Sequence, residues 1–279
     1  MRYGITIFAT DRTIGPGELA RAAEERGFAS LYLPEHTHIP VSRRTPAPTG
    51  DPELDPEYSR TLDPWVALCA AGAATTTMRL GSGVALVAQH HPINLAKQVA
   101  TLDHLTGGRA VLGVGFGWNR EEMEDHGVDY KQRRGVVREH VLAMQALWSE
   151  DEAGFVGEHV SFDPTWSWPK PVRRRVPVLI GGGAGPLLFA HVAEYADGWI
   201  PIGGAGLGAA LPALREAWAE AGRDPAGPDV VPFGTLPTPG KIDYYRGLGV
   251  TEVVLRVPGG DRDAALRSLD ELAAVVFRV

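Results

Sequence analysis

Short apolar runs rich in β-branched residues alternate with helical patterns along the chain. The runs predict eight strands, at residues 3–8, 30–34, 79–87, 109–115, 176–183, 198–203, 229–235 and 251–258. Each run is nearly continuous, as expected for parallel strands buried on both faces. Between the runs, apolar residues recur at helical spacing, as at Leu95, Val99 and Leu102, and predict helices.

Capping residues mark several of the predicted helix boundaries. Pro16 suits the first turn of a helix that Gly27 ends, and Gly107 ends the helix through Leu102. Asp63 is a suitable N-cap, and Pro64 follows it at the first helical position. These signals support alternating strands and helices.

Eight strands, each followed by a helix, predict an α/β fold of the (β/α)8 TIM-barrel type rather than an open doubly wound sheet. Residues 1–279 contain no linker and are expected to form a single domain. Two connections are too long to be plain loops, namely Thr37–Leu62 after the second strand and Phe116–Val176 after the fourth. We interpret both as insertions. The first is either a lid over the site or a disordered excursion.

Composition narrows the classes of partner. The net charge of -7 and the pI near 5.7 argue against nucleic-acid or anionic-membrane binding. A single cysteine, Cys69, excludes a disulfide framework. No segment resembles a signal peptide or a membrane span, so we expect a cytoplasmic protein that acts on a small molecule.

In a barrel of this type, the site lies at the carboxyl ends of the strands. The second strand ends in "LPEHTHIP", which places Glu35, His36 and His38 there. Such a cluster suits a metal site, an acid/base pair or a solvated loop. Metal-dependent barrel hydrolases need further ligands at later strand ends, and here the fifth strand ends in "IGGG" and the sixth in "WIPIG". We therefore expect no metal, favour His36 as an acid/base or a polar cofactor contact, and assign His38 to the loop.

Glycines follow two other strands. A turn that opens a helix contains Gly181, Gly182, Gly183 and Gly185, and its free N–H groups suit a phosphate, although a tight turn without a ligand is the alternative. The stretch "GVGFGWN" carries Gly115, Gly117 and Asn119. It could pass a planar cofactor or its ribityl chain, or its glycines could simply relieve crowding at the barrel rim.

Together, "LPEH", "LDPW", "TTTMRLGSGV", "AKQVATLDHLTGGRAVLGVG", "VPVLIGGG" and "ADGW" resemble the bacterial luciferase-like monooxygenase superfamily. More narrowly, the chain resembles the branch whose oxidoreductases use the deazaflavin coenzyme F420. The likeness spans essentially the whole chain, and the stretch beginning "AKQVATLDHL" is its most specific part.

The resemblance implies a cofactor at the mouth of the barrel. Its ring would lean on a bulge around Ala85 and Leu86, often with a non-prolyl cis peptide. Gly115 and Gly117 would flank the cofactor, and Gly181–Gly183 with Gly185 would hold its phosphate. His36 would supply a proton, and Glu35 would orient it.

One departure concerns the acid that some deazaflavin dehydrogenases carry after the fourth-strand glycines. Trp118 and Asn119 stand there, and Glu121 and Glu122 follow on a predicted helix. We hypothesise an F420-dependent oxidoreductase that transfers a hydride between the reduced deazaflavin and an organic substrate. The alternatives are an FMN-dependent monooxygenase and a non-catalytic flavin-binding barrel. The resemblance also implies a homodimer.

Overall fold

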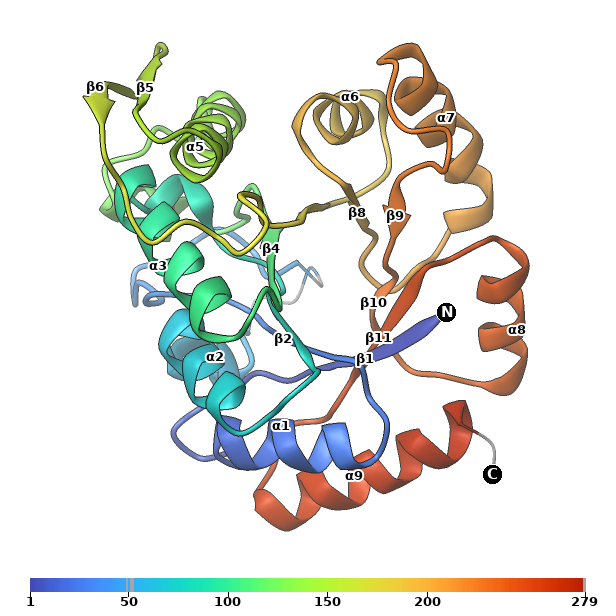
Figure 1. The fold of residues 1–279 in the computed structure, drawn as a ribbon. Helices are drawn as coiled ribbons and strands as arrows, with labels where there is room; N and C mark the ends of the chain where they lie inside the picture. The colour runs from blue at the N-terminus through green and yellow to red at the C-terminus, as the bar shows by residue number, and fades with distance from the viewer. Residues whose placement is uncertain (49, 51–52, 278–279) are drawn as a thin grey trace.

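The computed structural model describes residues 1–48, 50 and 53–277, and it shows a curled parallel sheet surrounded by helices (Figure 1). Within these residues, nine strands form the sheet in the order β10-β11-β1-β2-β3-β4-β7-β8-β9. Their bounds are β1 (Arg2–Thr6), β2 (Ser30–Leu33), β3 (Arg79–Ser82), β4 (Ala110–Val114), β7 (Val178–Gly181), β8 (Gly198–Ile200), β9 (Asp229–Val230), β10 (Phe233–Thr235) and β11 (Glu252–Arg256).

The two end strands of the sheet are successive parts of one segment. Sequence analysis predicts a single strand at 229–235, but the structure divides it into β9, which pairs with β8, and β10, which pairs with β11. Pro232 lies at the break, where it has no N–H to donate to a ladder. The sheet therefore curls until residues 229–235 join its two ends.

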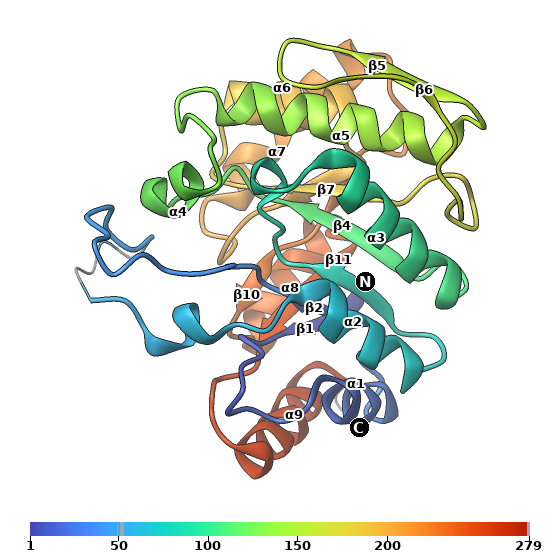
Figure 2. The ribbon, with the colours of Figure 1, turned by 90° about the vertical axis from the view of Figure 1, so that its left-hand side faces the viewer.

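Helices pack around the outside of the sheet, as Figures 1 and 2 show. Their bounds are α1 (Pro16–Glu25), α2 (Pro64–Ala73), α3 (Pro92–Leu105), α5 (Arg133–Ser149), α6 (Pro186–Tyr195), α7 (Leu207–Glu220), α8 (Pro239–Gly247) and α9 (Arg262–Val276). The predicted cap of α2 is confirmed, because Oδ1 of Asp63 accepts a hydrogen bond of 2.9 Å from the N–H of Val66.

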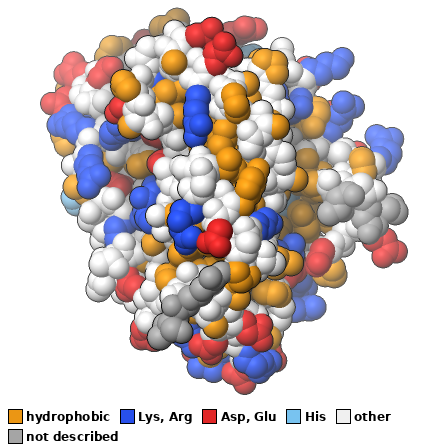
Figure 3. Space-filling view, turned by 90° about the vertical axis from the view of Figure 1, so that its right-hand side faces the viewer, with side chains coloured by type: hydrophobic (Ala, Val, Ile, Leu, Met, Phe, Trp, Pro, Cys, Tyr) orange, Lys and Arg blue, Asp and Glu red, His pale blue; other side chains and the backbone are white. Residues whose placement is uncertain are grey.

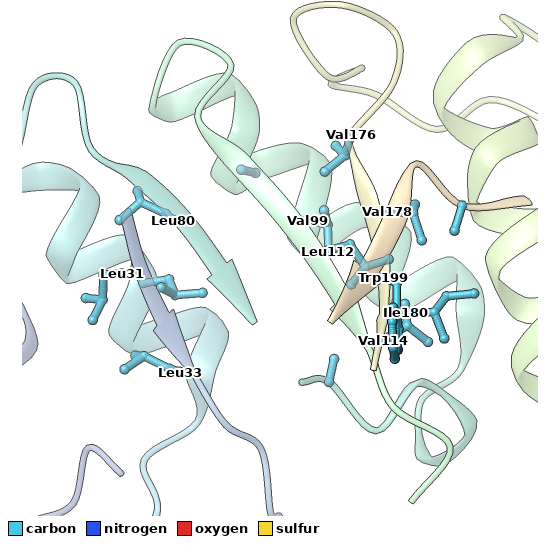
Figure 4. Close-up of a cluster of buried hydrophobic side chains, with 14 of the residues drawn as sticks. Leu31, Leu33, Leu80, Val99, Leu112, Val114, Val176, Val178, Ile180 and Trp199 are labelled. Atoms are coloured by element: carbon cyan, nitrogen blue, oxygen red, sulfur yellow. The ribbon is translucent and has the colours of Figure 1, made fainter. Parts of the chain in front are cut away.

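Apolar side chains cover both faces of the sheet, because successive side chains of a strand point to opposite sides. One cluster fills the inside of the curled sheet and includes Tyr32, Val111, Leu179 and Phe233. A larger cluster lies between the strands and the helices, and Figure 4 shows part of it around Leu112. Burial on both faces explains the continuous apolar runs of the sequence.

Long segments follow β2 and β4. Residues 34–63 contain the short helix η1 (Pro56–Arg60), and positions 49, 51 and 52 of the predicted lid lie outside the described residues. Residues 115–177 contain α4 (Arg120–Asp125), α5 and a hairpin of β5 (Ala153–Val156) and β6 (Ser161–Thr165).

The two long segments meet beside α4 (Figure 2). The carboxylate of Glu121 accepts bonds of 3.0 Å from the N–H of Arg44 and 2.6 Å from Oγ1 of Thr45. Nε2 of His38 lies 3.0 Å from Oδ2 of Asp125. The first segment is therefore tied at both of these points to the helix that follows β4.

The surface carries both signs of charge. On the face in Figure 3, acidic and basic side chains are interspersed. Among the described residues, the helices are all too short or too polar to cross a membrane.

Candidate active site

A cavity of about 580 Å³ opens where the carboxyl ends of the strands meet. Its walls come from strand ends and from the long segments after β2 and β4. They include Ile7, Phe8, Pro34, Glu35, His36, Tyr58, Gly83, Val84, Leu86, Gly115, Phe116, Gly117, Trp118, Arg133, Arg134, Gly181, Gly182, Gly183, Phe233 and Arg256. Most of the candidate residues from sequence analysis therefore share one cavity.

Val84 forms part of the cavity wall between two glycines. A Cβ atom on Gly115 would lie 2.4 Å from Cγ2 of Val84, and one on Gly181 would lie 3.0 Å from Cγ1. Both contacts are too close for a larger residue. The non-prolyl cis peptide expected around Ala85 and Leu86 is found just before them, between Gly83 and Val84.

His36 lies in the cavity wall with a carboxylate behind it. Its Nδ1 is 2.8 Å from Oε2 of Glu122, and the other oxygen of Glu122 accepts a bond of 3.2 Å from the N–H of Thr37. The His36 side chain is 7% exposed and that of Glu122 is fully buried. Nε2 of His36 bonds to no described residue, so it is the ring nitrogen that can exchange a proton with a molecule in the cavity.

Glu35 has a different partner. Its Oε1 lies 2.8 Å from Nε2 of His90, and its Oε2 accepts a bond of 2.7 Å from the N–H of Leu86. Glu35 thus anchors the backbone that follows Gly83 and Val84. The expected pairing of Glu35 with His36 is replaced by two separate acid–histidine pairs. Glu35 reaches the segment after β3, whereas His36 reaches α4.

Sequence analysis noted Glu122 but gave it no role in the site. The available signal was its position in the first turn of a helix that follows a strand end at the active face. Spacing alone could not select it over Glu121, which instead binds the segment at Arg44 and Thr45. Only the way α4 packs against the segment after β2 distinguishes the two acids.

The pair of His90 and Glu35 makes stability depend on pH. Burial lowers the pKa of His90, but the hydrogen bond and charge of Glu35 raise it by more, so the net shift is upward. A histidine with a raised folded-state pKa stabilises the fold fully below its unfolded pKa, and this contribution is lost as the pH rises through the folded value.

We therefore predict that His90→Gln lowers the Tm more at about pH 5.5 than at about pH 9, on either side of the ordinary histidine pKa. Thermal unfolding of the wild type and of His90→Gln at each pH gives the loss of Tm. The effects of other titrating groups cancel when the two proteins are compared at the same pH. His104→Gln, on α3, is the matched control. An equal loss of Tm at both pH values would contradict the role given to the pair.

Aromatic rings form the wall next to His36. The ring of Tyr58 lies 5.3 Å from that of His36 and 4.7 Å from that of Phe8, between ring centroids. The ring of Trp118 lies 5.7 Å from that of His36. Trp118 occupies the position where some deazaflavin dehydrogenases are expected to carry an acid, and it gives the cavity an aromatic surface there.

Arginines and glycines form another part of the cavity. Gly182 has a φ of 147°, and a Cβ atom on Gly183 would meet nothing within 4 Å. Arg133 and Arg134, which sequence analysis missed, begin α5 and line the same cavity. Nε of Arg133 and Nη1 of Arg134 are buried and bond to no described residue. Unpartnered guanidinium donors beside an open glycine turn suit a phosphate.

The remaining candidates do not line this cavity. Ala85 is buried in the strand layer, where it bridges to Val114. Gly185 is the N-cap of α6, and His38 is bonded to Asp125. Asn119 is buried at the start of α4, and neither side-chain polar atom bonds to a described residue.

In the part of the chain that the structure describes, no group of three or more His, Cys, Asp and Glu side chains is arranged to hold an ion.

A sequence model described as luciferase-like monooxygenase matches residues 16–237. The chain belongs to this family. The description of this family supports an oxidoreductase.

Two mycobacterial relatives match most of the chain. An uncharacterized protein of Mycobacterium tuberculosis strain H37Rv is 47% identical over 277 residues, which cover 98% of each chain. The F420-dependent hydroxymycolic acid dehydrogenase of the same strain is 29% identical over 225 residues, covering 78% of this chain and 56% of the relative.

The fold is also that of a solved luciferase-like enzyme. An F420-dependent secondary alcohol dehydrogenase, solved with an F420–acetone adduct, matches with a TM-score of 0.78 at 18% identity. The match covers 99% of this chain and 98% of that one.

Proposed function

We propose that the protein is an F420-dependent oxidoreductase that transfers a hydride between the deazaflavin and an organic substrate. The observation that carries the proposal is His36, held at Nδ1 by a buried carboxylate while its other nitrogen faces the cavity. The F420-dependent names of a relative and of a structural neighbour support the choice of cofactor.

The residues present fit a deazaflavin carrying a phosphate. Gly182 and Gly183 with Arg133 and Arg134 would hold the phosphate, because Nε of Arg133 and Nη1 of Arg134 lack partners among the described residues. The wall at Val84, which Gly115 and Gly181 leave clear, would support the ring. The predicted roles of Ala85, Gly185 and Asn119 would then be indirect, because these residues shape the backbone rather than the cavity wall.

The cofactor, when bound, supplies or accepts the hydride. His36 supplies the proton that balances it. In the reducing direction, a substrate carbonyl carbon gains the hydride and Nε2 of His36 gives a proton to its oxygen. Glu122 accepts the Nδ1–H hydrogen bond, which fixes the tautomer and stabilises the charged ring. The rings of Tyr58 and Trp118 keep water from the reacting atoms.

Two alternatives use the same cavity. An FMN-dependent monooxygenase is consistent with the family description. It needs the same phosphate grip, by which we mean Gly182, Gly183, Arg133 and Arg134. A barrel that only binds a flavin needs no proton donor, whereas His36 with Glu122 is built as one. The observed pair therefore favours an enzyme over a binding protein.

We predict that the purified protein binds F420 at least tenfold more tightly than FMN. Titration of the protein with each cofactor, followed by absorbance and fluorescence, measures both dissociation constants. Reoxidation of the bound reduced cofactor by a panel of carbonyl compounds then tests turnover. Tight FMN binding with oxygen consumption would instead assign the protein to the monooxygenases.

Other expectations remain predictions. We propose that the curled sheet is a complete (β/α)8 barrel, that residues 1–279 are one functional domain, and that the segments after β2 and β4 are insertions that shape the mouth. A homodimer and a cytoplasmic location also stay predictions.

A further inference from the structure

Arg256 is a cation of the cavity that the proposed hydride chemistry does not use. It ends β11 and lines the cavity at its carboxyl end. Around the curled sheet, β1 to β4 separate β11 from β7, which carries the glycine turn, in one direction, and residues 229–235 with β8 separate them in the other. Arg256 and the predicted phosphate grip therefore belong to different sides of the mouth.

The guanidinium of Arg256 has spare hydrogen-bonding capacity. Its side chain is 48% exposed, and Nη2 makes one long contact of 3.5 Å with Oε2 of Glu57. An arginine has five N–H donors, and a contact of this length is a weak hydrogen bond. The remaining donors of Arg256 bond to no described residue. The guanidinium of Arg256 can therefore donate hydrogen bonds to a second acceptor besides Glu57.

Glu57, which lies outside the cavity lining, already places one carboxylate beside Arg256. Burial raises the pKa of Glu57, the charge of Asp55 raises it further, and Arg256 opposes both. Its carboxylate rests against Gly259, where an added Cβ atom would lie 1.6 Å from Oε1. The chain thus holds the carboxylate of Glu57 beside Arg256 although burial and the charge of Asp55 both disfavour its ionised form.

The aromatic side chains of Phe8 and Tyr58 connect Arg256 to His36 along the cavity wall. The guanidinium carbon of Arg256 lies 5.9 Å from the centroid of the Phe8 ring. Phe8 contacts Tyr58, and Tyr58 contacts the ring of His36. A molecule that spans this wall from Arg256 to His36 needs a flat or bulky apolar body, an anionic group at one end and a reacting group at the other.

We propose that Arg256 binds the carboxylate of the substrate, whose apolar or aromatic body packs against Phe8 and Tyr58 and whose reacting carbon faces His36. The substrate carboxylate reaches Arg256 from the cavity, competes there with Glu57, and forms the two-point contact that arginine makes with carboxylates. This inference rests on the proposed function and defines its substrate class as carboxylated carbonyl or alcohol compounds.

The test uses matched acids and amides as probes, namely benzoate with benzamide, phenylacetate with phenylacetamide, and 2-naphthoate with 2-naphthamide. Binding is measured by calorimetry on the full chain, with and without saturating F420. We expect at least one acid to bind about tenfold more tightly than its amide. Arg256→Gln should abolish this preference, and Glu57→Gln should increase acid binding severalfold because it removes the competing carboxylate.

Arg60→Gln is the matched control, since Arg60 pairs with Asp11 and lies outside the cavity lining. No acid preference in any pair, or a preference that survives Arg256→Gln, would overturn the inference. A preference lost in Arg134→Gln instead would place the carboxylate at the phosphate grip, which also overturns it. If F420 fails to bind while the Arg256-dependent preference persists, the proposed cofactor is wrong and the carboxylate site stands.

Discussion

Replacing His36 with Ala should lower kcat by roughly 10²- to 10⁴-fold, the range for a lost general acid or base. The dissociation constant for F420 should change only a few-fold, because the proposed phosphate contacts lie elsewhere in the cavity. Steady-state turnover with an acceptor found in the carbonyl panel gives kcat, and fluorescence titration gives cofactor affinity. The two readouts separate loss of chemistry from loss of binding.

Glu122→Gln tests how His36 is held. An amide can still meet Nδ1 but cannot stabilise a charged ring, so we expect a smaller loss of kcat and an altered pH profile. His38→Ala is the control, because His38 lies close by in the chain but bonds to Asp125 and does not line the cavity. Unchanged turnover in His36→Ala with a confirmed substrate would remove His36 from the mechanism.

Replacing Arg134 with Gln should weaken F420 binding about 10- to 100-fold, because a charge-assisted hydrogen bond contributes about 1.5–3 kcal/mol. Burial lowers the pKa of Arg134, and the nearby charge of Arg133 lowers it further, so a bound anion would relieve an unfavourable site. The variant should also lose part of the salt dependence of binding. Titration at low and high salt measures both effects.

Arg138→Gln is the matched control for Arg134. It lies one turn further along α5 and pairs on the surface with Glu194. A deazaflavin riboside without phosphate should bind wild type and Arg134→Gln equally well. If Arg134→Gln weakens the riboside and F420 to the same extent, Arg134 contacts the ring or shapes the cavity and does not hold the phosphate.

Much of the fold could be predicted because its signals are local. Both-face burial gives continuous apolar strands, and caps such as Asp63 mark helix starts. The seventh predicted strand shows the limit of this reasoning. The apolar run at 229–235 predicts one strand. The break at Pro232 depends on which neighbouring strand each half pairs with. Strand pairing is a property of the closed arrangement and is weakly encoded in a single run.

Local patterns along the chain encode the alternation of strands and helices and the strand ends that meet at one face, and therefore the presence of Glu35, His36 and the glycines there. The partners of these residues depend on how the chain packs. In the folded chain, His36 pairs with Glu122, and Glu35 pairs with His90. Arg134 lines the same cavity as the glycine turn, and Arg256 lines another side of it. Periodicity encodes which way a side chain faces, whereas a contact across dozens of residues depends on how separate elements pack.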